Sequence, residues 1–463
     1  MADSVALAKP KGAGLGVEPA MTVATRDRLE RALARIDDPA GEGARTCLTV
    51  YRDSAREAAG AAGRRAAAGA TLGPLDGVIV TIKDLFDVAG EPTRAGSTVR
   101  AEAPPATTDA PVVQRLRAAG AVIVGKTNMS EFAFTGVGAN PHYGTPGNPA
   151  DRSRVPGGSS SGAAVAVADG MCEIAIGTDT GGSTRIPAAL CGLVGYKPSK
   201  SRIPTAGAFP LSPTLDSVGP IARTVAACAA ADAILAGEEP QPLEPVSLNG
   251  LRLGVAQGLP LEELDATVAE RFDAAVARLG QGGARVSDEA FPQFDAMARV
   301  QSRATIATAE AWRIHRQQLA ARGDDYDPQV RFRIELGGTV SDAAYALMLE
   351  ERAALVRAMD ARLAELDALV LPTTPIVAPT MAEISSQEGF RDANRLLLRN
   401  TAIANFFDLC AISLPLPGAA LPVGLMLVAR RGHDRRLFAL AAAVERASSP
   451  SEPTKKGGPE GPP

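Results

Sequence analysis

Two clusters of small residues mark the place where this chain could carry a serine nucleophile. The first is GGSSSG at 157–162 and the second is Gly181-Gly182-Ser183, and a helix-like run follows each of them. Glycines at such turns allow positive φ and close backbone approach, while free N–H groups at a helix start can stabilise an oxyanion. Small polar residues also cap helices and form turns in most proteins, so either cluster alone favours a structural role. Two clusters that bracket one helix and one strand favour a catalytic site.

A serine nucleophile needs a base, and histidine is the usual one. The chain has three histidines, His142, His315 and His433. His142 follows an Asn-Pro turn, His315 lies in a polar helix-like run, and His433 sits among arginines. We expect each of them to be a surface or capping residue, so a Ser-His-Asp triad is not favoured.

Lysine is the other base that serine enzymes use. Of the 48 Lys and Arg residues only eight are lysines, and four of these lie near the chain ends, which leaves Lys83, Lys126, Lys197 and Lys200. In a chain that otherwise uses arginine, a lysine can do what arginine cannot, which is to release its proton. Lys83 is the strongest candidate because it ends the apolar run 78–82, where partial burial would lower its pKa. The structural alternative is a strand-end lysine paired with Asp84.

The stretch GAVIVGKT at 120–127 fits the letter pattern of a phosphate-binding loop. Such a loop needs flexible residues after its first glycine, so that backbone N–H groups can surround the phosphates. The residues AVIV are β-formers that follow a helix-like run, and they indicate a buried strand after a glycine cap. We therefore expect no nucleotide site here.

Alternating helical and strand-like segments must position these residues. Helices are expected at 25–36, 110–120, 162–170 and 261–280, with long helical runs around 296–321 and 341–366; strands are expected at 77–83, 121–124, 173–179, 251–257, 366–372, 410–416 and 422–430. This alternation is typical of the α/β class. The Pro- and Glu-rich segment 236–250 fits either a domain linker or a surface loop.

Composition points to a globular protein that acts on small molecules. Hydrophobic residues make up 46% and charged residues 22%, and the formal charge of -4 provides no basic field for nucleic acid. The five cysteines are odd in number and scattered, which argues against disulfides and zinc and favours a cytoplasmic location. No apolar run is long enough for a signal peptide or a membrane span. A small-molecule substrate is thus the expected partner, and a homodimer stays open.

The chain resembles the amidase signature family of serine amidohydrolases. The pieces that carry the resemblance are TIKD with Lys83, VGKTNMSEFA (124–133), PGGSSSG (156–162), GTDTGGSTRIPA (177–188), GLVGYKPS (192–199), LDSVGP (215–220), LPTTP (371–375) and LPVGLML (421–427). The resemblance covers most of 25–446 and implies a single α/β/α unit with a central mixed β-sheet flanked by helices. The segment 236–250 then becomes a surface loop, while 1–24 and 447–463 are expected to be loose ends.

Carried over residue by residue, the resemblance implies a catalytic triad. Ser183 matches the nucleophile, Ser159 the bridging serine that follows a cis peptide bond, and Lys83 the base. Hydrolysis would proceed through an acyl-enzyme on Ser183 without metal or cofactor. The resemblance also implies an oxyanion hole made of the backbone N–H groups of Thr180, Gly181, Gly182 and Ser183. It makes Asp179 and Arg185 structural supports of the turn that carries Ser183. Met129 is implied as a substrate contact.

The main alternative within the family is the ammonia-supplying component of glutamyl-tRNA amidotransferase, its A subunit, which works with a partner protein. Its pattern has an aspartate that holds the glutamine amino group, and this chain aligns Leu398 at that position. Leucine cannot pair with an ammonium group, so free glutamine is expected to be a poor substrate. The sequence therefore favours a stand-alone amidase for a small or aromatic carboxamide.

Overall fold

The computed structural model describes residues 24–448 of the chain. The predicted loose ends, 1–24 and 447–463, therefore lie almost entirely outside the described residues. No helix within 24–448 combines the length and the apolar character needed to cross a bilayer.

One mixed sheet runs through the described residues, and its 11 strands lie in the order β1-β3-β2-β4-β6-β5-β10-β11-β9-β7-β8. The strands are β1 (Cys47–Val50), β2 (Ile79–Lys83), β3 (Val122–Thr127), β4 (Ile174–Asp179), β5 (Val194–Lys197), β6 (Ser217–Ala222), β7 (Arg252–Ala256), β8 (Arg285–Glu289), β9 (Ala368–Pro372), β10 (Cys410–Leu416) and β11 (Val423–Ala429). Parallel pairing joins β2 to β3 and β4, and β7 to β8 and β9, whereas the other neighbours are antiparallel. The predicted mixed sheet is thus confirmed.

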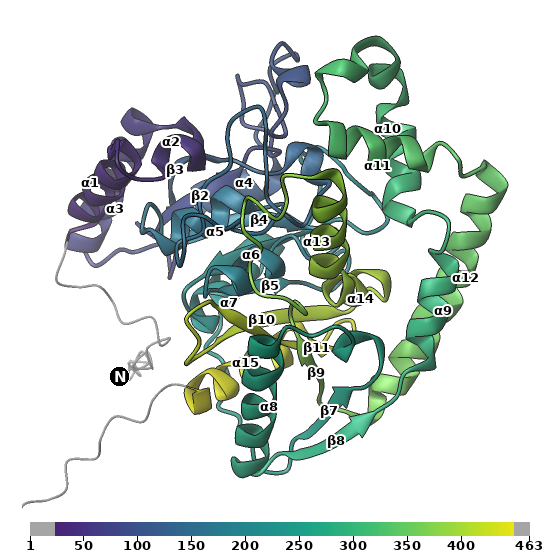
Figure 1. The fold of residues 1–463 in the computed structure, drawn as a ribbon. Helices are drawn as coiled ribbons and strands as arrows, with labels where there is room; N and C mark the ends of the chain where they lie inside the picture. The colour runs from purple at the N-terminus through teal and green to yellow at the C-terminus, as the bar shows by residue number, and fades with distance from the viewer. Residues whose placement is uncertain (1–23, 449–463) are drawn as a thin grey trace, which may run out of the picture.

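Helices surround this sheet (Figure 1). They are α1 (Thr25–Asp37), α2 (Gly43–Thr46), α3 (Arg52–Ala67), α4 (Pro111–Ala118), α5 (Ser161–Ala168), α6 (Arg185–Leu190), α7 (Val225–Ala236), α8 (Ala266–Gln281), α9 (Pro292–Val300), α10 (Ile306–Arg322), α11 (Pro328–Gly337), α12 (Asp342–Arg362), α13 (Gln387–Arg399), α14 (Thr401–Phe406) and α15 (Asp434–Ser448). In Figure 1, α9 and α12 pack along one side of the molecule, and α10 and α11 pair beyond them.

The sheet is continuous across the predicted linker. The segment 236–250 contains no strand, and the strand that follows it, β7, joins the same sheet through β9. The segment is therefore a loop that connects parts of one sheet, as the family resemblance implied. The long helical run expected at 296–321 is instead two helices, because residues 301–305 interrupt it between α9 and α10.

The middle of the sheet positions the serine clusters. β2 and β4 are parallel neighbours with Ile82 opposite Ile176, so their C-terminal ends lie together at one edge of the sheet. Ligand sites in α/β proteins gather at such carboxyl ends. Lys83 ends β2, while the turn that carries Ser183 joins β4 to α6. The stretch 120–127 forms the end of a turn and then β3, which rules out a phosphate loop.

Candidate active site

Lys83 is fully buried and donates hydrogen bonds to two hydroxyl groups. Its Nζ lies 2.8 Å from Ser159 Oγ and 3.0 Å from Thr178 Oγ1. Burial lowers the pKa of Lys83 to about 7, although the carboxylates of Asp179 and Asp216 act to raise it. Asp84 does not pair with it in the described structure and accepts the Gly96 N–H instead. A substantial neutral fraction of Lys83 is therefore present near neutral pH.

Ser159 belongs to the first serine cluster and lies two residues before the start of α5. The peptide bond that links Gly158 to Ser159 is cis, as the resemblance implied. The cluster then enters α5 at Ser161, and every residue of the cluster is buried. The Ser160 N–H donates to the carbonyl oxygen of Ser183 at 3.3 Å, which ties the two serine clusters together.

The turn that carries Ser183 is held by the buried carboxylate of Asp179. Its two oxygens accept the N–H groups of Gly182 and Thr184 at 2.9 and 3.1 Å. The Arg185 guanidinium donates to both oxygens, at 2.9 and 3.1 Å, and holds the pKa of the Asp179 carboxyl well below its usual range in spite of burial. Asp179 and Arg185 therefore shape the turn, which is the supporting position expected for them.

Two residues from α14 complete this support. Asn405 Nδ2 donates to Asp179 Oδ1 at 2.9 Å, and Thr401 Oγ1 donates to the Gly181 carbonyl at 2.6 Å. Gly182 has φ +136°, and a Cβ there would lie 2.1 Å from Thr401 Oγ1. Position 182 therefore requires a glycine, because Thr401 of α14 packs directly against the turn there.

Hydrogen bonds at the turn limit which backbone N–H groups could form the predicted oxyanion hole. The Gly182 N–H already donates to Asp179, so a bound oxyanion would compete with a buried carboxylate for this hydrogen. Within the described residues, no hydrogen bond is made by the N–H groups of Gly181 or Ser183. The Thr180 N–H is likewise without a hydrogen bond among these residues, so Thr180, Gly181 and Ser183 can act as donors, whereas the Gly182 N–H is already engaged. Thr180 is fixed through its side chain, whose Oγ1 donates to Asp216 at 2.6 Å.

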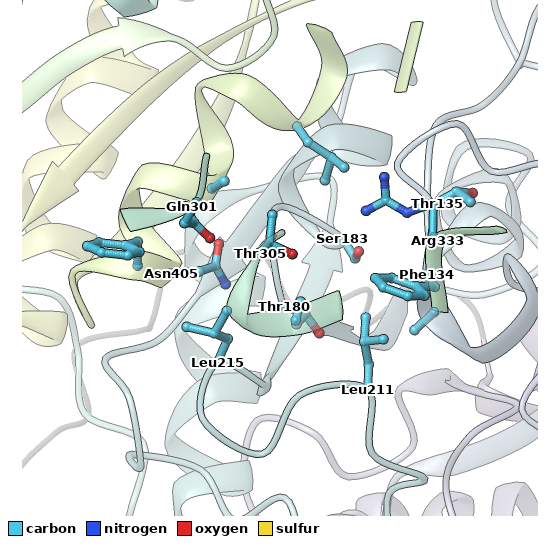
Figure 2. Close-up of a pocket in the computed structure, with 16 residues that line it drawn as sticks. Phe134, Thr135, Thr180, Ser183, Leu211, Leu215, Gln301, Thr305, Arg333 and Asn405 are labelled. Carbon is cyan, nitrogen blue, oxygen red and sulfur yellow. The ribbon is translucent and has the colours of Figure 1, made fainter. Parts of the chain in front are cut away.

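Ser183 lines a cavity of about 630 Å³ that opens to solvent (Figure 2). Most of its wall is apolar, with leucines such as Leu211, Leu215 and Leu398 and the rings of Phe134 and Phe406. Leu398, which the family resemblance sets at the position of a glutamine-binding aspartate, lines the cavity. Met129 is not among the residues that line this cavity, and its side chain is fully buried in the hydrophobic core, so the structure gives no support to its predicted substrate contact.

The remaining candidate bases lie outside this cavity. Lys126 is buried in β3, 3.5 Å from Glu91, and Lys197 donates to the backbone carbonyls of Pro198 and Leu409. Burial lowers the pKa of Lys197 to about 8.

His315 is expected from the sequence to be a surface or capping residue, and this prediction is wrong. Its side chain is 1% exposed and packs against Phe132, and burial lowers its pKa to about 4.

Sequence reasoning assigned no role to four residues of the site. Thr178 and Asp216 fell inside motifs that the sequence analysis had marked, so a signal for them existed. Thr401 and Asn405 reach the turn from more than 200 residues away, and only the fold brings them there.

Comparisons with known proteins agree on one family. The family model described as Amidase matches residues 27–438. A 2-amino-5-chloromuconic acid deaminase of Comamonas testosteroni is 39% identical, with 91% of this chain and 93% of the relative covered. The A subunit of the glutamyl-tRNA(Gln) amidotransferase of Anaeromyxobacter dehalogenans (strain 2CP-C) is 36% identical, with 95% and 96% covered.

A solved structure extends this agreement to three dimensions. The crystal structure of an amidase has a TM-score of 0.83 and 35% sequence identity, with 92% of this chain and 97% of that chain covered. A family model that spans nearly the whole chain, similar relatives and a similar structure lead to the same assignment. The chain therefore belongs to the amidase signature family, whose members hydrolyse C–N amide bonds.

Proposed function

We propose that this protein is a cofactor-independent amidase that hydrolyses a small or aromatic carboxamide through an acyl-enzyme on Ser183. The observation that carries the proposal is the 2.8 Å hydrogen bond from a buried lysine with a lowered pKa to Ser159, next to a turn that exposes Ser183 to a cavity. A neutral lysine is the base that a serine nucleophile without histidine requires.

In the first half of the reaction, neutral Lys83 takes the proton of Ser159, and Ser159 takes the proton of Ser183. The Ser183 oxygen then attacks the amide carbon, and negative charge develops on the carbonyl oxygen. Backbone N–H groups of Gly181 and Ser183 stabilise this charge, because they are fixed in place before the reaction begins. The same relay returns the proton to the nitrogen, the C–N bond breaks, and ammonia or an amine leaves.

In the second half, water attacks the acyl-enzyme. Lys83 and Ser159 take a proton from the water, a new C–O bond forms, and the bond to Ser183 breaks. The carboxylic acid product leaves, and the proton returns to Ser183. The atoms of one water molecule are thus divided between the acid and the amine.

The cavity supports a small or aromatic acyl group. Its wall combines leucine and phenylalanine side chains with a few polar groups, which is the usual composition of small-molecule sites. The relative from Comamonas testosteroni is named for a muconic acid derivative, 2-amino-5-chloromuconic acid. A compact acyl chain of that kind is compatible with this wall.

The second candidate is a glutaminase that supplies ammonia to a partner, since the relative from the glutamyl-tRNA(Gln) amidotransferase is 36% identical over nearly the whole chain. Against it, Leu398 faces the cavity, and no Asp or Glu lines it within the described residues. The α-ammonium group of glutamine would therefore enter the cavity without a counter-charge. We propose that glutamine is among the poorest substrates.

The experiment that tests the proposal measures ammonia release from glutamine, aliphatic amides, arylacetamides and anilides. We expect turnover of at least one amide other than glutamine. Lys83→Arg should lose about 10² to 10⁴ in rate, nearly as much as Lys83→Ala, because arginine cannot release its proton. Lys200→Arg serves as the matched control, since Lys200 lies closer to the surface and donates to backbone carbonyls. Glutamine hydrolysed faster than every other amide would favour the second candidate.

A further inference from the structure

One cation at the cavity has no ion-pair or hydrogen-bond partner within residues 24–448. Arg333, on α11, lines the cavity together with Ser183. Within residues 24–448 its guanidinium forms no ion pair and donates no hydrogen bond, and its Nε is buried without an acceptor. Figure 2 shows the guanidinium beside Phe134, at the same end of the cavity as the Ser183 hydroxyl.

Three other arginines on these elements form ion pairs. Arg185 pairs with Asp179, Arg352 pairs with Asp408, and Arg331, two residues earlier on the same helix, pairs with Asp324 and Glu335. For Arg333, burial lowers the pKa to about 10, and no carboxylate of the described residues lies close enough to oppose this effect. The Arg333 side chain is half-buried, but its Nε has left water without an acceptor, and this is costly for a charged donor. An acceptor supplied from elsewhere would therefore stabilise the guanidinium.

The cavity gives an anion a favourable place and a cation an unfavourable one. Every other lining side chain in the described structure is apolar or neutral, from Leu211 and Leu398 to Thr135 and Gln301. Apolar walls strengthen the attraction between Arg333 and a negative charge. An ammonium group would find no carboxylate and would be repelled by Arg333.

The geometry around Arg333 suits a carboxylate. Its Cζ lies 4.7 Å from the centroid of the Phe134 ring, and this contact holds the guanidinium plane while leaving N–H groups free at its edge. A planar fork of N–H donors matches the two oxygens of a carboxylate. One unpaired cation also balances the single charge of a carboxylate, whereas a phosphate would call for more.

We propose that Arg333 binds a carboxylate of the substrate, and that the enzyme prefers monoamides of dicarboxylic acids to neutral amides and to glutamine. The inference rests on the proposed function, because it assumes that the amide carbon reaches Ser183. Arg333 then anchors one end of the substrate while Ser183 attacks the other.

The kinetic test uses pairs of substrates that differ in one charge. Malonamate, succinamate, glutaramate and adipamate are compared with the corresponding diamides, which have the same size but no carboxylate. We expect kcat/KM for the best monoamide to exceed that for its diamide by about 10- to 10²-fold, the range of a hydrogen-bonded charged group. Arg333→Met should remove most of this preference, whereas Arg333→Lys should keep part of it through its charge. Arg331→Gln is the control for loss of a cation elsewhere on α11.

A binding test separates this inference from the proposed catalytic role. Calorimetry with the Ser183→Ala protein measures affinity for the same monoamides and diamides without turnover. We expect monoamides to bind more tightly than diamides, and the added Arg333→Met change to abolish the difference.

The outcomes are distinct. Arg333-dependent binding of monoamides without hydrolysis by the unmodified enzyme would support the inference while contradicting the proposed function. Hydrolysis with no preference for monoamides, or with a preference that survives Arg333→Met in a protein of unchanged circular dichroism, would overturn the inference alone. Glutamine bound more tightly than glutaramate would overturn it as well, because the cavity would then accept an ammonium group.

Discussion

The lowered pKa of Lys83 has a measurable effect on stability, which Lys83→Met should reveal. The pKa falls from 10.5 to about 7 on folding because burial disfavours the charged form. Between these values the unfolded chain holds about one proton more than the folded chain at this residue. Stability therefore increases with pH in this window, by about 1.4 kcal/mol per unit. Below about pH 7 the buried charge of Lys83 lowers the free energy of unfolding by roughly 5 kcal/mol. This loss disappears as the pH approaches the pKa of lysine in the unfolded chain.

Methionine has a similar shape and no charge, so Lys83→Met removes this pH-dependent term. It also leaves the hydroxyls of Ser159 and Thr178 without their buried donor, which costs about 1 to 3 kcal/mol each and does not depend on pH in this range. The quantity to follow is the difference in unfolding free energy between the two proteins.

Urea unfolding of both proteins at about pH 7, 8 and 9 measures this difference. The stability of the unmodified protein relative to Lys83→Met should rise by about 2 kcal/mol from pH 7 to 9. Groups that titrate equally in both proteins cancel, and Asp216, whose pKa burial raises to about 6, titrates below the window. A difference that stays flat across this range would show that Lys83 keeps an ordinary pKa, and the reasoning would fail.

Three further predictions concern the same site. The profile of kcat/KM against pH should rise through about pH 7, because Lys83 is protonated below its folded pKa and cannot accept a proton there; an acid limb above pH 9 would contradict this. Thr178→Val removes one acceptor of the Lys83 ammonium, which favours the neutral form, and the acid limb should move to lower pH. Gly182→Ala should lower the melting temperature and the amidase rate together, because its Cβ would collide with Thr401; unchanged values would show that the turn adapts freely.

Local sequence was enough to place the triad candidates. Lys83 ends an apolar run, and the two serine clusters flank one helix and one strand, so local patterns singled out these segments, whereas the roles of Ser159 and Ser183 came from the family resemblance. The pairing of β2 with β4 follows the usual side-by-side arrangement of parallel strands in α/β proteins.

Contacts between residues far apart in the chain could not be predicted from local sequence patterns. Asn405 and Thr401 reach the turn through the packing of α14, and Arg333 reaches the cavity from α11, a helix with no motif of its own. His315 looked exposed because its neighbours in sequence are polar, but Phe132 and Tyr326 enclose it from other segments. In each case the deciding neighbour lies far away in the chain.

The central claim is that Ser183 is the nucleophile, and covalent labelling tests it most directly. The protein is treated with a fluorophosphonate probe, digested, and analysed by mass spectrometry, with Ser183→Ala as the matched control because a small side chain replaces a small one. Our account predicts one adduct, on the peptide that contains Ser183, and no adduct in the control. An adduct on Ser159 or Ser161, with Ser183 unmodified, would contradict it.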